Sequence, residues 1–502
     1  MRLPWRMTHT TPAEQSEQSE QQPVESAMRA TATATQPTRR RARYWLYALE
    51  IAVFIAALAA TQILSASLWR LPNGDVDEYY AYARAFWETR PLFHALPVEY
   101  PPLAIVPFTL TIIPDLPNYY HIVFAVWMGA LMVGGYIAFL RLAGRPRALM
   151  YAVYLLLGTS ATLLARFDIV PALVALLALW FAERGRFGYA YIFIAVGVLL
   201  KLYPAFLLPI VLIEHWRAAT QVAIVEGRET AERAANWWRG GPFRAAAQFW
   251  RLPATQRTLR GLLLCLGLIL GCFAISFVLN PAGTLSGFQY AGSRPLQVES
   301  TPASLLWLGS IFGIPAYPNY SYTSLNFVGP LDTLLKPASL VALVAGCLWV
   351  YWRQARGKLT VGQAFLACLG IVLVTNKIFS PQYLIWIIPV VAYVEGFDWL
   401  WLAVCFLTWC DFPIIYQLHH PIQTVTYSWQ FMPVLALRNG LLLYATLRVI
   451  IRPKKTPFQF PGSASGPPSR RTTTVDEREA QIAGEAGNDA ESAARDSQII
   501  GV

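Results

Sequence analysis

The residues with the clearest chemical potential lie in one acidic stretch, from Gly74 to Ala104. Its acids are Asp75, Asp77, Glu78, Glu88 and Glu99. A carboxylate at the start of a helix can act as a general base toward an attacking hydroxyl, which makes Asp75 and Asp77 the catalytic candidates. The structural alternative is a capping box between Asp75 and Glu78, opening an amphipathic helix. On this pattern, either aspartate could work while the other caps.

Glu99 and Tyr100 follow in the block VEYPPLA. The proline pair favours an extended approach and can then start a helix. We expect Glu99 or Tyr100 to bind substrate hydroxyls, with a simple turn as the alternative.

Two further blocks carry cations at the ends of apolar segments. Arg166 and Asp168 lie in ARFDIVP, where an ion pair between them is the plain alternative to a substrate role. Lys201 lies in LLKLYPAFLLP between two apolar runs that are too short for ordinary crossings. The alternative for Lys201 is a lysine that reaches the membrane surface.

The block TNKIFSPQYLIW repeats this arrangement with Lys377 and also contains Gln382, a candidate substrate-binding residue. Arg294 and Glu299 lie in SRPLQVES, where solvated loop charges are the alternative to a substrate role. Lys201 and Lys377 on one face of a membrane would suit an anion. Carboxylates combined with such cations are what group transfer from a lipid phosphate requires.

Composition assigns the chain to the polytopic membrane proteins. Its 502 residues are 55% hydrophobic and 14% charged, too apolar for a soluble core. The net charge of +11 comes from clusters beside apolar runs, so it indicates membrane orientation rather than a nucleic-acid partner. His419 and His420 lie near Asp411 without a clear third ligand. We therefore expect no metal and no cofactor.

The basic cluster Arg39–Arg43 before the first apolar run predicts a cytoplasmic N-terminus. The run 103–113 is too short to span, and we expect it to lie along the interface. The predicted fold is all-α, with about twelve transmembrane helices, both termini cytoplasmic and a long first outer loop carrying interfacial helices. The expected spans are 44–67, 119–140, 148–165, 168–183, 188–200, 203–215, 260–280, 333–352, 361–375, 382–395, 399–416 and 431–451.

The predicted domain organisation follows from these spans. Residues 1–43 and 453–502 form disordered cytoplasmic tails, and 44–452 form the membrane domain, with outer loops 70–118 and 281–332. Arg438 falls inside the last span, where a charge is costly, so we expect it to face the bundle interior. The cytoplasmic segments are too short for a nucleotide-binding domain, and there is no P-loop.

Six blocks resemble the GT-C superfamily of membrane glycosyltransferases, and most closely glycosyltransferase family 87, the polyprenyl-phosphate-mannose-dependent mannosyltransferases and their relatives. They are GDVDEYYAYA, EYPPLA, RFDIVPALVALLAL, KLYPAFLLP, RPLQVES and NKIFSPQYLIWIIP. The resemblance implies an inverting transfer on the outer face, with the first-loop aspartate as base. In the family pattern this aspartate precedes a tyrosine by four residues, which maps onto Asp75 and Tyr79. Some relatives carry a histidine before the RPLQ block, and this chain has none at 290–293.

The expected protein is therefore an inner-membrane glycosyltransferase that moves a hexose, with mannose as the expected sugar, from a polyprenyl-phosphate carrier to a glycolipid or glycan. Its partners are this donor, the acceptor and the bilayer. A flippase of lipid-linked sugars is the alternative from another class, and a related enzyme using a sugar such as arabinofuranose is the second alternative.

Overall fold

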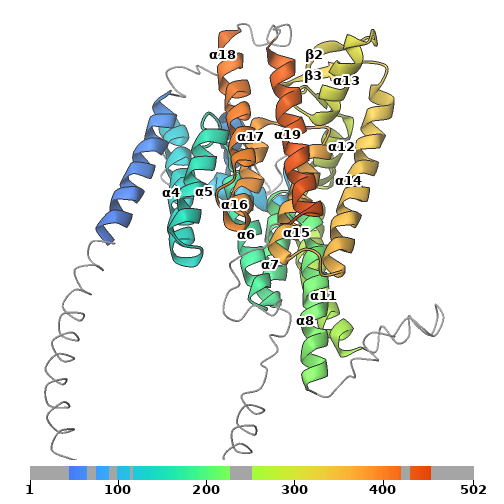
Figure 1. Ribbon diagram of the computed structural model, residues 1–502. Coiled ribbons are helices and arrows are strands. Elements are labelled where there is room, and N and C mark those ends of the chain that lie inside the picture. The colour runs from blue at the N-terminus through green and yellow to red at the C-terminus, as the bar shows by residue number, and fades with distance from the viewer. Residues whose placement is uncertain are drawn as a thin grey trace, which may run out of the picture.

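The computed structural model describes residues 44–64, 75–89, 99–112, 117–226, 252–419 and 430–453. The predicted tail 1–43, nearly all of the tail 453–502, His420 and parts of the first outer loop lie outside these residues. Within the described ranges the chain is mainly helical (Figure 1).

The apolar runs form helices close to the expected boundaries. After a first helix at Tyr44–Leu64, the helices are α2 (Asp75–Glu88), α3 (Ile105–Leu110), α4 (Tyr120–Leu142), α5 (Arg145–Thr159), α6 (Ile169–Glu183), α7 (Phe187–Leu200), α8 (Leu208–Val225), α11 (Pro253–Leu279), α12 (Pro281–Ser293), α13 (Thr301–Ile311), α14 (Asp332–Ala355), α15 (Val361–Thr375), α16 (Leu384–Val394), α17 (Trp399–Trp409), α18 (Tyr416–Leu418) and α19 (Phe431–Ile451).

Six helices of the described chain are long and apolar enough to cross a membrane, which supports a membrane-spanning protein. They are Tyr44–Leu64, Tyr120–Leu142, Pro253–Leu279, Asp332–Ala355, Trp399–Leu418 and Phe431–Ile451. The prediction of about twelve spans is not confirmed. It counted several short apolar runs as crossings, and four apolar helices are indeed shorter: Ile169–Glu183, Phe187–Leu200, Val361–Thr375 and Pro381–Val394. A helix of about 15 residues covers only about 22 Å of a hydrocarbon core of roughly 30 Å.

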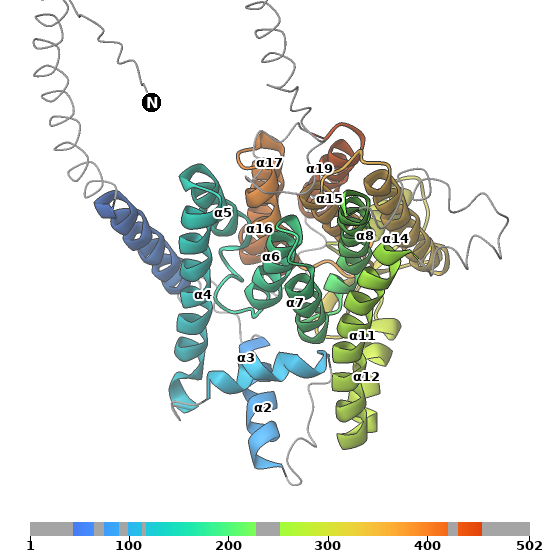
Figure 2. The ribbon, with the colours of Figure 1, turned by 90° about the horizontal axis from the view of Figure 1, so that it is seen from below.

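These shorter helices form the centre of the bundle. The central helix α15 is buried from Val361 to Val374 and packs on α14, α16 and α19. Helix α6 packs on α7, and α11 packs on both α7 and α8. Figure 2 shows α6, α7 and α16 enclosed by longer helices. The chain therefore breaks its helices in the interior, where other protein segments can satisfy the freed backbone groups.

The acidic first loop forms α2, whose buried face is Val76, Tyr79, Ala83 and Phe86. This confirms the predicted amphipathic helix. The helix packs on α3 and α4, and a short 3₁₀ turn at Pro102–Ala104 leads into α3. Figure 2 shows α2 and α3 together beside the main bundle. The described part of the first loop is thus folded into helices that pack against the bundle.

The segment between α12 and α14 contains a small antiparallel sheet. Its strands β1 (Leu296–Gln297), β2 (Tyr317–Ser321) and β3 (Ser324–Val328) have the order β1-β3-β2. Tyr322 and Thr323 take positive φ values of 54° and 52° in the turn between β2 and β3, the geometry of a tight hairpin turn. The all-α prediction was therefore incomplete, because strands this short carry no clear alternating pattern.

Candidate active site

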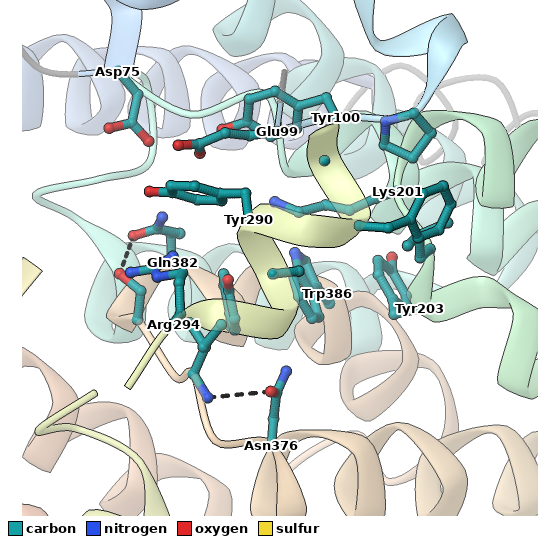
Figure 3. A pocket seen from close by; sticks show the side chains of 18 of the residues that line it. Asp75, Glu99, Tyr100, Lys201, Tyr203, Tyr290, Arg294, Asn376, Gln382 and Trp386 are labelled. Atoms are coloured by element: carbon teal, nitrogen blue, oxygen red, sulfur yellow. Dashed lines mark hydrogen bonds between the residues drawn. The ribbon is translucent and has the colours of Figure 1, made fainter. Parts of the chain in front are cut away.

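A cavity of about 400 Å³ lies where several helices break. Its walls come from α2, the turn after residue 98, the loop before α6, the break after α7, α12, β1 and the break between α15 and α16 (Figure 3). The polar and charged residues that line it include Asp75, Glu78, Glu99, Arg166, Lys201, Arg294, Gln297, Asn376, Ser380 and Gln382. The folded chain therefore gathers side chains from segments more than 300 residues apart.

The acids of the first loop form one side of this cavity. Asp75 is the first residue of α2, and Glu99 lies just before the proline pair at 101 and 102. Figure 3 shows the carboxyl groups of Asp75 and Glu99 pointing into the cavity from the same side. Burial raises the pKa of Glu99, and a hydrogen bond from Tyr290 opposes part of this rise. Two acids with different surroundings thus face one space.

The aspartate and arginine of the ARFDIVP block pair with different partners. Arg166 forms an ion pair with Asp75 across 91 residues of chain. Asp168 is buried and accepts hydrogen bonds from Lys201, at 2.5 Å, and from Trp386. The alternative of a local pair between Arg166 and Asp168 is wrong. The start of α6 directs Asp168 into the core, while Arg166 remains at the cavity.

Lys201 lies at the end of α7 in the break before a 3₁₀ turn at Tyr203–Leu207. Its ammonium group lies within 6 Å of four ring centroids, at 5.8, 5.0, 5.4 and 4.9 Å for Tyr100, Phe167, Tyr383 and Trp386 respectively. Burial lowers the pKa of Lys201. The alternative of a lysine reaching the membrane surface is therefore wrong, because this side chain turns inward.

Arg294 enters the cavity from the segment after α12. Its Nη2 donates to Ser324 Oγ at 2.9 Å, and its guanidinium carbon lies 5.5 Å from the Tyr290 ring centroid. Its Nε is buried and has no hydrogen-bond partner among the described residues. A buried donor of this kind favours an anionic or hydroxyl-bearing ligand. Gln382 also lines the cavity and accepts from Ser380 Oγ at 2.5 Å.

Two candidates from the first loop, the acid Asp77 and the aromatic Tyr79, lie outside the cavity lining. Asp77 Oδ1 is 2.7 Å from His121 Nε2, so it joins α2 to the start of α4. Tyr79 is 0% exposed and stacks on Phe108 with ring centroids 4.3 Å apart. Its hydroxyl reaches the Tyr100 hydroxyl at 3.5 Å. Tyr79 therefore supports Tyr100, which does line the cavity.

Glu299 and Lys377 also lie outside the cavity lining. Glu299 is buried and accepts a hydrogen bond from the Tyr416 hydroxyl at 2.7 Å. The Lys377 ammonium group donates to the backbone carbonyls of Gly292 and Arg294. Lys377 thus binds the backbone of the segment that carries Arg294, and Glu299 lies at the end of that same segment. The prediction that Lys201 and Lys377 converge on one anion is therefore wrong, because Lys201 lines the cavity and Lys377 does not.

Several cavity residues were not predicted from the sequence. The most notable are Glu78, Tyr290 and Asn376, each next to or within a block already singled out. The block TNKIFSPQYLIW could have indicated Asn376, since an amide beside a lysine at a helix break is a ready ligand for hydroxyls. Among the described residues, no group of three or more His, Cys, Asp or Glu side chains is arranged to hold a metal ion.

The arrangement suits the transfer of a group from an anionic leaving group. Carboxylates at one side can take a proton, and cations at the other can stabilise negative charge. No curated protein sequence matches the chain, and no solved structure matches it. Residues 99–227 match the family model of glycosyltransferase family 87, a region that includes Glu99, Arg166 and Lys201. This part of the chain is therefore similar to glycosyltransferase family 87, and the match indicates a glycosyltransferase.

Proposed function

We propose that this glycosyltransferase moves a hexose, with mannose as the expected sugar, from a polyprenyl-phosphate carrier to a hydroxyl of a glycolipid or glycan. One observation carries the proposal: the carboxyl groups of Asp75 and Glu99 and the cations of Lys201 and Arg294 line the same cavity. A lipid-phosphate donor needs both kinds of group, one for the incoming hydroxyl and one for the departing phosphate.

The proposed reaction is a single displacement with inversion. The acceptor oxygen forms a bond to C1 of the sugar while the bond from C1 to the phosphate oxygen breaks. Asp75 takes the hydroxyl proton, and Arg166, its ion-pair partner, orients the carboxylate. The electron pair of the broken bond leaves with the polyprenyl phosphate. Glu99, Tyr100 and Gln382 would hold sugar hydroxyls.

The two cations would contribute unequally to binding the phosphate. Lys201 already pairs with Asp168 at 2.5 Å, so part of its charge is compensated. Arg294 has a buried Nε without a partner among the described residues. A guanidinium also offers several donors in a planar geometry that matches phosphate oxygens. Arg294 is therefore the leading phosphate ligand, and Lys201 supports it.

The distribution of basic residues supports an outward-facing cavity. Helix α6 begins three residues after the cavity-lining Arg166 and ends just before Arg184, while α7 begins just after Arg186 and returns to the cavity-lining Lys201. Helix α15 likewise runs from the basic turn at Lys358 back to the cavity. Basic turns favour the cytoplasmic side. The cavity then faces outward, both termini are cytoplasmic, and the membrane is the bacterial inner membrane.

The test is a transfer assay with purified protein in lipid bilayers and a membrane lipid extract as acceptor. Radiolabelled mannose should pass from polyprenyl-phosphate-mannose into a lipid or glycan product, and GDP-mannose should give none. Product from GDP-mannose alone would contradict the lipid-phosphate donor. Product only from polyprenyl-phosphate-arabinofuranose would change the sugar. Movement of an intact lipid-linked sugar across the bilayer, with no transfer, would favour the flippase.

A further inference from the structure

Lys377 holds the backbone on both sides of Ser293. Its ammonium group donates to the Gly292 carbonyl at 2.7 Å and to the Arg294 carbonyl at 3.0 Å. The Lys377 carbonyl in turn accepts from the backbone N–H of Gln297 at 3.0 Å. Three hydrogen bonds therefore tie the segment from Gly292 to Gln297 to one residue in the break between α15 and α16. Charge-assisted bonds of this kind are among the stronger ones in proteins.

A second cation holds the same segment at its other end. Arg438 and Asn439, consecutive residues of α19, both donate to the backbone carbonyl of Glu299. Arg438 is 0% exposed and lies 3.6 Å from Asp411. Its guanidinium carbon is 4.3 Å from the ring centroid of Phe379, two residues after Lys377. Arg438, from α19, therefore contacts the same break in which Lys377 lies.

Arg294 lies between these anchors. Neither Lys377 nor Arg438 lines the cavity, whereas Arg294 does, with an unpartnered buried Nε among the described residues. Beyond the anchors, the segment is joined to the sheet through the pairing of Leu296 with Phe327. A side chain that must meet a ligand with correct geometry needs a backbone fixed by such supporting contacts.

We propose that Lys377 and Arg438 form a two-point clamp that positions Arg294 for the phosphate of the lipid-linked donor. This rests on the proposed function, because that function supplies the phosphate. Both cations act here as positioning residues, through backbone carbonyls, and neither touches the donor. The clamp explains why Lys377 lies near the site without facing the cavity.

The first test measures binding of farnesyl phosphate, a short polyprenyl phosphate, to the full-length protein, with farnesol as the uncharged control. Lys377→Met should weaken binding about tenfold, as loss of a charge-assisted contact implies. In an Arg294→Met background the same change should add nothing, because Lys377 acts only through Arg294. Lys377→Arg should restore most of the binding.

The matched control is Lys336→Met. Lys336 pairs with Asp332 on its own helix at 3.6 Å and, among the described residues, forms no hydrogen bond or ion pair with the segment from Gly292 to Glu299. It should bind farnesyl phosphate like the wild type. If Lys377→Met weakens binding equally with and without Arg294, Lys377 acts directly on the phosphate and the clamp is refuted.

The second test measures hydrogen exchange of the backbone amides at 292–299 and needs no ligand. Lys377→Met should speed exchange there several-fold, and so should Arg438→Met combined with Asp411→Asn, a pair that removes the buried charge of Asp411 together with its cation. Arg294→Met and Lys336→Met should not. Unchanged protection in both clamp variants would overturn the proposal. If the wild-type protein does not bind farnesyl phosphate, the proposal of a lipid-phosphate donor is wrong. The hydrogen-exchange measurement then still tests whether Lys377 and Arg438 hold the segment at 292–299.

Discussion

The cavity and the cluster of Glu299, Asp411 and Arg438 use the same residue types in different ways. In the cavity, the side chains of Arg166 and Asp75 are 19% and 32% exposed. In the cluster, those of Arg438 and Asp411 are both 0% exposed. Charges that border open space can exchange water for a ligand. Charges that are fully buried among apolar side chains cannot contact a ligand and interact only with other groups of the protein.

The surroundings of the two regions explain this difference. The cluster borders the apolar core around Leu296, Phe327 and Phe431, where water cannot compensate a charge. Its arginine donates to the backbone carbonyl of Glu299 and stabilises the segment from Gly292 to Glu299. Exposure to the cavity, and not the identity of the side chain, therefore separates candidate ligand-binding charges from structural ones. Three changes test this comparison.

The largest expected effect is on catalysis in the cavity. Asp75→Asn should lower the transfer rate by about 10²–10⁴-fold, the usual contribution of a general base, while binding of the donor persists. The control is Asp77→Asn, because Asp77 pairs with His121 outside the cavity lining. Initial rates from the radiolabel assay measure both. Equal losses of transfer rate in the two variants would contradict the assignment of Asp75, and not Asp77, as the general base.

The next effect is on stability in the closed cluster. Arg438→Met should lower the free energy of unfolding by about 3–5 kcal/mol, because it leaves Asp411 and Glu299 buried without their cation. Arg294→Met, beside open space, should cost less than about 1 kcal/mol. Denaturant unfolding in detergent measures both. If Arg438→Met matches the wild type in stability, the cluster does not depend on its charge.

The smallest effect is on the pH dependence of transfer. Burial raises the pKa of Glu99, and the hydrogen bond from Tyr290 lowers it part of the way back. Burial, together with the hydrogen bond to Glu99, raises the pKa of Tyr290 to about 12, so this hydroxyl keeps its proton near neutral pH. Tyr290→Phe removes the opposing bond, so the pKa of Glu99 rises further.

The carboxylate of Glu99 is then lost at a higher pH as the solution is acidified. The acid limb of the profile of kcat/KM against pH should shift upward by less than about one pH unit. Glu99→Gln should abolish this dependence on Tyr290. A shift of the acid limb to lower pH in Tyr290→Phe would contradict the proposed contact.

Much of the helical fold was predictable because helix formation depends on local apolar runs and their breaks. The last helix, Phe431–Ile451, and α15, Val361–Thr375, begin and end at the expected residues. The prediction that Arg438 faces the interior is confirmed, since an unpaired charge against lipid would be costly. The small sheet was missed because its strands are short and because β1 pairs with β3 across about 30 residues of chain.

The sequence by itself therefore determined the membrane character, most helix boundaries and the blocks that resemble glycosyltransferase family 87. Only the tertiary structure decided which charges meet: Arg166 with Asp75, and Lys201 with Asp168. It also decided that Lys377 donates to two backbone carbonyls, whereas the sequence pattern predicted that it binds an anion. The physical reason is distance. Apolar runs act over neighbouring residues, whereas an ion pair needs atoms within about 4 Å, which packing of distant helices alone arranges.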